Sequence, residues 1–297
     1  MPAGPAGGRN RALTAARISK KKPARLPSKK LWADRGLRMF VALPFRMARR
    51  NISFLRKNGL GVEIVLYDTN WICSYPADKV AELAGRLRDA EVEVTVHGPI
   101  FDLNPGSLDV VVRDYTRHCY FKTLAICHAL GATALVFHLG LNPLLPESAL
   151  DGWLEGSIRA WEPIVDMAEQ LRMTIRLENM FAPSPRFIVA LKNGLKSNAI
   201  KICFDVAHFN VYSKTPLINW LDEIGPELDE VHLNDNMGTE DEHLELGKGI
   251  IDFRNFFDEL TSRGINPQFT IEMTSDKFAG SLNYLAKNDL LAPFARH

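Results

Sequence analysis

The sequence predicts a single closed (β/α)8 barrel of parallel strands, an α/β fold, preceded by a basic N-terminal extension. The chain has 297 residues, of which 46% are hydrophobic, and this suits one barrel domain of about 250 residues. From residue 39 onward, eight short apolar segments alternate with amphipathic ones, as in a parallel sheet with helical crossovers. The first apolar segment runs into Leu43-Pro44-Phe45-Arg46, without the glycine-rich phosphate turn expected of an open doubly wound sheet.

Residues 1–38 form the predicted extension, which we expect to be disordered because it offers little to bury. Residues 1–30 contain nine Lys or Arg and no Asp or Glu, so that the rest of the chain holds 27 basic against 35 acidic residues. The predicted barrel, residues 39–297, is therefore acidic overall. This charge argues against nucleic acid as a partner, since a protein that grips a phosphate backbone normally presents a basic face.

Other features of the composition narrow the class of protein. The chain has no run of about 18 apolar residues, and its N-terminus lacks the apolar stretch of a signal peptide, so we expect no membrane partner. The four cysteines form no C-x-x-C pair, which favours reduced thiols over a thiolate zinc site. We therefore expect a cytoplasmic protein, whose oligomeric state the sequence leaves open.

The predicted strands are apolar runs, as expected of strands that are buried on both faces of a sheet. They cover residues 40–43, 62–66, 92–96, 134–137, 174–177, 200–204, 230–233 and 269–271. Helix-like stretches between them include residues 77–88, 115–130, 153–171 and 253–263. Gly131, Gly225 and Gly264 stand where helices are expected to end, because glycine favours the conformation of a C-terminal cap.

The predicted strands from the third to the eighth each end in a residue that can bind a metal. These residues are His97, His138, Glu178, Asp205, His232 and Glu272, and His208, Asp241 and His243 follow in later loops. In a parallel barrel the carboxyl ends of the strands meet in one mouth. Burying several carboxylates there without a cation would be costly. The pattern therefore predicts a divalent metal at the mouth, with an ion-pair network among protein groups as the alternative.

The segments VHGPIFDLNPGS, FHLG, LEN, CFDVAH, VHLND and IEM resemble the xylose-isomerase-like barrel superfamily, in which they occur in this order on successive strands. The resemblance covers about residues 39–275. That superfamily contains sugar isomerases and epimerases, inosose dehydratases and metal-dependent apurinic endonucleases. The resemblance therefore implies a metal-dependent enzyme, and its branches imply different metal sites.

The sugar isomerase and epimerase branch implies a site for one divalent metal. Carried over by position, its four ligands are Glu178, Asp205, His232 and Glu272. In that branch the two glutamates also act as acid and base on a sugar, sugar phosphate or polyol, through a metal-stabilised enediolate. Carboxylate and imidazole ligands suit Mn, Zn, Co or Mg.

The apurinic endonuclease branch implies a larger site, with two or three zinc ions. Its ligand set is matched by His97, His138, Glu178, Asp205, His208, His232, Asp241, His243 and Glu272. Such a site would suit hydrolysis of a phosphodiester by a bridging hydroxide.

Departures from the endonuclease pattern favour the sugar branch. Ile100 replaces an aromatic residue, Asn179-Met180-Phe181 replaces a Gly-Gln-Gly-like stretch, and the turn after the first strand has no histidine. We therefore expect a small carbohydrate substrate. Five residues of the larger set lie outside the one-metal set, and we expect them to bind an additional metal or the substrate. They are His97, His138, His208, Asp241 and His243.

Three further residues are candidates for binding the substrate. Arg46 follows the first strand and could hold an anionic end of the substrate. Lys248, within Gly247-Lys248-Gly249, could approach a phosphate or carboxylate, with solvent exposure as the alternative. Asn179 follows the proposed ligand Glu178 directly.

Overall fold

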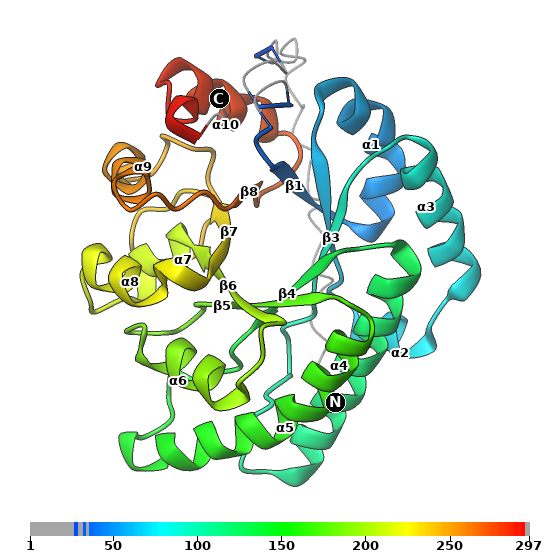
Figure 1. The fold of residues 1–297 in the computed structure, drawn as a ribbon, viewed down its shortest axis with the longest axis vertical. Coiled ribbons are helices and arrows are strands. Elements are labelled where there is room, and N and C mark those ends of the chain that lie inside the picture. The colour runs from blue at the N-terminus through cyan, green and yellow to red at the C-terminus, as the bar shows by residue number, and fades with distance from the viewer. Residues whose placement is uncertain (1–26, 29–31, 34–35, 295–297) are drawn as a thin grey trace, which may run out of the picture.

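The computed structural model describes residues 27–28, 32–33 and 36–294 and contains a closed barrel in which each strand pairs in parallel with the next and β8 pairs with β1. The strands are β1 (Met39–Pro44), β2 (Gly61–Val65), β3 (Val94–His97), β4 (Ala134–His138), β5 (Thr174–Glu178), β6 (Ile200–Asp205), β7 (Leu228–Leu233) and β8 (Gln268–Ile271). Figure 1 shows these strands at the centre of a ring of helices. The predicted (β/α)8 barrel is confirmed.

The helices of the ring follow the strands along the chain. They are α1 (Phe45–Asn58), α2 (Thr69–Ser74), α3 (Ala77–Asp89), α4 (Val110–Leu130), α5 (Leu150–Gln170), α6 (Arg186–Leu195), α7 (Val206–Tyr212), α8 (Leu217–Ile224), α9 (Phe253–Ser262) and α10 (Phe278–Lys287). Short 3-10 helices cover Glu147–Ala149 (η3), Gly225–Glu227 (η4) and Ala292–Phe294 (η5). No described helix is both long and apolar enough to cross a membrane.

The ends of several helices are fixed by the residues that the sequence places there. The side chain of Asp109 accepts a hydrogen bond from the backbone N–H of Val111 and so caps the start of α4. Gly131 ends α4 with a φ of 72°, the left-handed conformation that glycine adopts without strain. Gly264 follows α9 with a φ of 65°, whereas Gly225 keeps a helical φ of −49° because the chain continues into η4.

The segment before β1 is described only in part. The basic residues of the predicted extension up to Arg35 lie outside the described residues. Arg38 is described, and its guanidinium donates a hydrogen bond to the side-chain oxygen of Gln268 on β8, at 2.7 Å. Two described residues of the range 1–38, Trp32 and Leu37, are buried in the core. The indole N–H of Trp32 donates a hydrogen bond to the carbonyl of Asn58 at the end of α1, at 2.8 Å. These two residues extend the packed body upstream of Met39.

Polar side chains fill part of the barrel interior. Arg176 of β5 is 1% exposed, and its guanidinium lies 2.5 Å from the carboxylate of Glu230 on β7. Gln268 on β8 donates a hydrogen bond to Glu230 as well, at 2.5 Å. Because side chains alternate along a strand, residue 176 lies on the same face as 178, and 230 on the same face as 232. The interior network therefore lies directly below the strand-end residues.

Candidate functional site

The polar residues at the ends of β3 to β7 converge at the barrel mouth with Glu272, which follows β8. The register pairs His138 with Glu178 and Asp205 with His232 on neighbouring strands. Burial is nearly complete, since Glu178, Asp205 and His232 are all 0% exposed. Parallel pairing thus brings side chains that are far apart in the sequence into one buried cluster.

Glu178 lies at the centre of this cluster and faces four imidazoles. One of its oxygens, Oε2, lies 3.2 Å from Nε2 of His97 and 2.6 Å from Nε2 of His138. The other, Oε1, lies 3.0 Å from Nδ1 of His232 and 3.3 Å from Nδ1 of His208. Each oxygen is therefore shared between two possible metal ligands, as a bridging carboxylate would be.

Two groups of possible ligand atoms share Glu178. In the first, His97, Glu178, His232 and Glu272 offer atoms that all lie within 4.8 Å of one another, and in the second His138 and His208 join Glu178. Glu272 contributes through Oε2, which lies 3.0 Å from Nδ1 of His232. Three of the four expected ligands of the one-metal site thus meet around a single imidazole nitrogen.

The loop after β7 adds a third set of contacts. Asp241 Oδ2 lies 3.2 Å from Nε2 of His208 and 3.1 Å from Nε2 of His243. His243 donates a hydrogen bond through Nδ1 to the carbonyl of Glu272, at 2.9 Å. This bond leaves Nε2 of His243 facing Asp241 and available to a metal. The structure therefore brings together all five of the additional candidates.

Asp205, the fourth expected ligand, is held by hydrogen bonds from protein groups. Its Oδ1 accepts the backbone N–H of His208 at 2.5 Å and so caps the start of α7, and its Oδ2 accepts the amide of Asn234 at 2.8 Å. The amide of Asn179 bonds both the carbonyl and the N–H of Asp205. Asn179 therefore joins the ends of β5 and β6. Each Asp205 oxygen retains a second lone pair for a metal.

Electrostatics explain how the cluster balances its charge. Although burial opposes it, the Glu178 carboxylate raises the pKa of His97 to about 9. Burial also lowers the pKa of His243, but Asp241 and Glu272 outweigh it and raise that pKa to about 10. Burial raises the pKa of Glu272, but His232 outweighs it and lowers that pKa to about 2. The carboxylates of Glu178 and Glu272 are thus ionised, and protonated imidazoles supply the compensating positive charge.

The donor atoms of the cluster fit a divalent cation. Within the described chain, several buried side-chain atoms of the cluster make no contact with the geometry of a hydrogen bond, although some of them lie close to a charged neighbour. They are His138 Nδ1, His208 Nδ1, His232 Nε2, Asp241 Oδ1 and Glu272 Oε2. Buried polar atoms are normally satisfied, so this concentration at one place is unusual. Imidazole nitrogen and carboxylate oxygen are ligands of zinc, manganese and cobalt.

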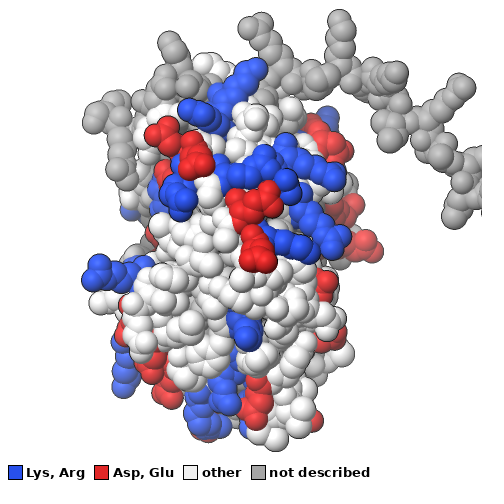
Figure 2. All heavy atoms as spheres, turned by 90° about the vertical axis from the view of Figure 1, so that its right-hand side faces the viewer, with Lys and Arg blue, Asp and Glu red and all other residues white. Residues whose placement is uncertain are grey.

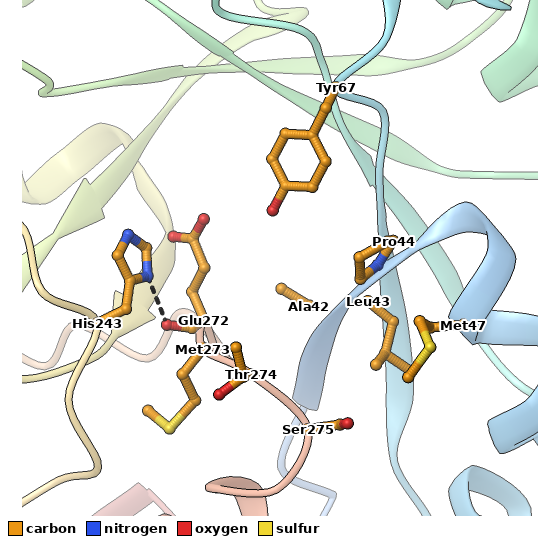
Figure 3. A pocket seen from close by; sticks show the side chains of 10 residues that line it. All are labelled: Ala42, Leu43, Pro44, Met47, Tyr67, His243, Glu272, Met273, Thr274 and Ser275. Atoms are coloured by element: carbon orange, nitrogen blue, oxygen red, sulfur yellow. Dashed lines mark hydrogen bonds between the residues drawn. The ribbon is translucent and has the colours of Figure 1, made fainter. Parts of the chain in front are cut away.

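A cavity of about 380 Å³ opens beside the cluster. Figure 3 shows the Tyr67 hydroxyl and the Glu272 carboxylate both pointing into it, from the ends of β2 and β8. Most other lining residues are apolar, among them Leu43, Met47 and Met273. Burial, followed by the negative charges of Glu272 and Glu63, raises the pKa of Tyr67 to about 12, so its hydroxyl stays protonated at neutral pH.

Neither of the remaining substrate candidates, Arg46 and Lys248, lines the cavity beside Glu272. Arg46 is exposed and lines a groove of about 870 Å³ between α1 and α3, together with Arg49, Arg50, Lys79 and Arg86. Figure 2 shows basic side chains gathered on this flank around a few acidic ones. Lys248 is also exposed, and its backbone N–H donates to the carbonyl of Glu245. The structure thus places Arg46 and Lys248 on the surface.

Two residues of the site were not anticipated from the sequence. Tyr67 follows β2 and lines the cavity. Glu63, in the middle of β2, is 0% exposed, and its Oε1 lies 3.1 Å from Nε2 of His232. The available signal for Glu63 was a single carboxylate inside the apolar strand Gly61–Val65, because an ionised group is rarely buried without a partner.

Comparison with known families gives a match over most of the chain. The sequence profile described as "Xylose isomerase-like TIM barrel" matches residues 56–292. Uncharacterized protein MJ1311 of Methanocaldococcus jannaschii is 28% identical over 262 residues, which cover 85% of this chain and 88% of that protein.

Solved structures show the same similarity. The TTHB071 protein of Thermus thermophilus, soaked with zinc chloride, is 29% identical, with a TM-score of 0.73, covering 88% of this chain and 100% of that one. A D-tagatose 3-epimerase-like protein is 25% identical, with a TM-score of 0.72, covering 87% of this chain and 98% of that one.

Proposed function

This chain belongs to the xylose isomerase-like TIM barrel family, and from that membership we propose that it is a divalent-metal-dependent isomerase or epimerase of sugars. The observation that carries the proposal is the placement of Glu178 and Glu272, each with an oxygen 3.0 Å from Nδ1 of His232. The cavity beside Glu272 is large enough for a monosaccharide. The similarity to a D-tagatose 3-epimerase-like protein supports the substrate class.

Glu178, His232 and Glu272 would hold the cation, with Asp205 as the fourth ligand expected from the resemblance. When bound, the metal supplies Lewis-acid polarisation of the substrate carbonyl, which acidifies the neighbouring C–H bond. The neutral hydroxyl of Tyr67 can donate a hydrogen bond to a sugar oxygen in the cavity. Together these groups would fix the orientation of a small polyhydroxylated substrate.

The two glutamates would carry out the proton transfers. Both are ionised, because His232 and the other imidazoles lower their pKa values despite burial. One carboxylate takes the proton as the C–H bond breaks and its electron pair moves toward the carbonyl. The other carboxylate can act as the acid after it takes up a proton from solvent. Transfer of that proton to the opposite face of the same carbon inverts the carbon, and the first carboxylate then releases its proton to solvent. Return of the first proton to the adjacent carbon, together with transfer of that carbon's hydroxyl proton to the original carbonyl oxygen, isomerises the sugar.

Exchange with solvent tests this proposal. The metal-loaded protein is incubated with ketohexoses in deuterated water with Mn²⁺, Co²⁺ or Zn²⁺, and the sugars are analysed by NMR and mass spectrometry. We expect one deuteron at C2 or C3 of a converted sugar. Glu272→Ala should abolish exchange, and continued exchange by a variant that still binds metal would refute the acid–base role of Glu272.

A second candidate function is hydrolysis of a phosphodiester. The observation that favours it is the number of possible ligands, since one metal needs about four ligands. Five further residues join the same network of contacts: His97, His138, His208, Asp241 and His243. Glu178 belongs to both groups of possible ligands, and the residues around it would hold two or three zinc ions, which would supply a hydroxide for attack on phosphorus.

Abasic-site DNA distinguishes the second candidate from the first. A hydrolase should nick a duplex that contains an abasic site, lose this activity with a chelator, and hold two or three metals per chain. Conversion of a ketose together with intact DNA would exclude this candidate.

A further inference from the structure

Glu63 is a buried carboxylate at the centre of the barrel that the proposed reaction does not use. All five residues of β2 are buried, and Glu63 is 0% exposed. Its Oε2 accepts a hydrogen bond from the hydroxyl of Thr95, at 3.4 Å. Its Oε1 has no hydrogen-bond partner in the described part of the chain and lies 3.1 Å from Nε2 of His232. A small rotation of either side chain completes a hydrogen bond between them.

The two nitrogens of His232 face different surroundings. Nδ1 faces the proposed metal ligands Glu178 and Glu272, each at 3.0 Å. Nε2 faces Glu63 and, at 3.9 Å, Glu230. An imidazole that binds a metal through one nitrogen is neutral and carries its proton on the other, where a hydrogen-bond acceptor orients the ring. Nε2 of His232 therefore needs an acceptor on the side away from the metal.

Glu230 is already occupied by other donors. Its Oε2 lies 2.5 Å from the Arg176 guanidinium, and its Oε1 accepts hydrogen bonds from Gln268 and Thr270. Glu63 has neither an arginine nor a lysine among its described contacts, and His232 is its nearest nitrogen donor. The Sγ atom of Cys203 also lies within 4.8 Å of a ring nitrogen of His232, but a thiol is only a weak acceptor. The strongest acceptor open to His232 is therefore Glu63.

We propose that Glu63 is a positioning residue, which accepts the Nε2–H of His232 and so holds the tautomer that presents Nδ1 to the metal. The inference rests on the metal site of the proposed function and adds to it a residue outside the ligand set. Glu63 also restrains rotation of the His232 ring, since the ring is then held at both of its nitrogens.

Metal affinity tests the role of Glu63 directly. Zn²⁺ and Co²⁺ dissociation constants are measured by competition with a chromophoric chelator for the wild type, Glu63→Leu, Glu63→Gln and the control Thr95→Val, which removes the other contact of Glu63. We expect Glu63→Leu to weaken binding by roughly 10- to 100-fold. Glu63→Gln should weaken it less, because the amide oxygen still accepts a hydrogen bond, and Thr95→Val should leave it unchanged.

Thermal unfolding of the metal-free proteins separates positioning from simple structural support. Burial raises the pKa of Glu63, which means that its surroundings disfavour the charged form. An apolar Leu at this buried position should therefore let the metal-free protein unfold at the wild-type temperature or above. Should Glu63→Leu not fold, the isosteric Glu63→Gln carries the comparison. If Glu63→Leu and Glu63→Gln bind metal with wild-type affinity, the positioning role of Glu63 is overturned, while the proposed function stands. The same holds if metal affinity falls only in variants whose metal-free form is also less stable. A wild-type protein that binds no metal would overturn the proposed function as well.

Discussion

Glu178 is the residue on which the site depends most. Both of its oxygens are shared between imidazoles, and the side chain is inaccessible to water. Its pKa is lowered well below the ordinary value, because the neighbouring histidines outweigh the effect of burial. A single substitution there should therefore affect every group of possible ligands at once.

Glu178→Gln should reduce metal affinity and metal-free stability together. The amide binds metals poorly, and its loss of charge leaves protonated imidazoles without their buried partner, a change that costs about 3–5 kcal/mol. Metal content and thermal unfolding measure the two effects. The control Glu223→Gln makes the same change on an exposed residue of α8. Unchanged metal content in Glu178→Gln would contradict the central role of this residue.

Tyr67→Phe should act on the substrate and not on the metal. The hydroxyl points into the cavity (Figure 3), and one hydrogen bond to a neutral group contributes about 0.5–1.5 kcal/mol. We expect KM for the sugar to rise roughly 2- to 12-fold, with the metal content of the wild type. A steady-state kinetic comparison checks this, and an unchanged KM would show that the substrate does not contact Tyr67.

At the scale of the elements, the alternation of side chains along each strand builds the site. On β5, Arg176 and Glu178 share the inner face, and on β7 Glu230 and His232 do so. Arg176 and Glu230 form an ion pair with each other inside the barrel. Glu178 and His232, two residues further along each strand, belong to the cluster at the mouth. The start of α7 then adds His208 to the cluster, because Asp205 caps that helix.

Two substitutions of Asp205 separate its role as a helix cap from its expected role as a metal ligand. Asn also caps helices well, whereas Ala costs about 1 kcal/mol at a cap. Asp205→Asn should therefore keep most of the metal-free stability and lower metal affinity, and Asp205→Ala should lower both. Normal metal affinity in a folded Asp205→Asn protein would remove Asp205 from the proposed ligand set.

The sequence was sufficient to predict the parts of the site that interrupt an apolar pattern at a strand end. All eight strands follow from apolar runs in the sequence. The cluster around Glu178 follows from the third to the eighth of these runs, each of which stops at a polar residue. Glu63 was missed because it lies inside a strand, where neighbours in sequence do not reveal the His232 side chain across the barrel. Arg46 was expected near the mouth because it follows β1, but the first turn of α1 directs it to the outer flank.

At the scale of the whole molecule, the buried imidazoles make the stability of the metal-free protein depend on pH. A histidine whose pKa is raised by folding adds stability below its unfolded pKa of 6.5, and this is lost as pH rises through the folded pKa. For His97 and His243 the folded values are about 9 and about 10.

The melting temperature of the chelator-treated protein should therefore fall as pH rises from 6.5 to about 10. With saturating Zn²⁺ the fall should be smaller, because the cation replaces the protons as the positive charge in the cluster. Thermal melts across this range with and without metal provide the measurement. If the melting temperature fell equally with pH in the metal-free and the zinc-loaded protein, the idea that the metal replaces protons in the cluster would be contradicted.

Bound metal should also stabilise the folded chain as a whole. Free metal at 100 times its dissociation constant adds about 2.7 kcal/mol to the free energy of unfolding. The same concentration should have little effect on Glu178→Gln, whose folded form binds the metal weakly. Differential scanning calorimetry over a metal titration measures this difference.

The most direct test is the metal content of the purified, dialysed protein, measured by elemental analysis. The account predicts at least one divalent transition metal per chain, about one for the sugar isomerase or epimerase and two or three for the hydrolase. It also predicts that the Glu178→Gln protein retains much less metal after the same dialysis. A folded wild-type protein that binds no metal, even after loading with Zn²⁺, Mn²⁺ and Co²⁺, would contradict the account.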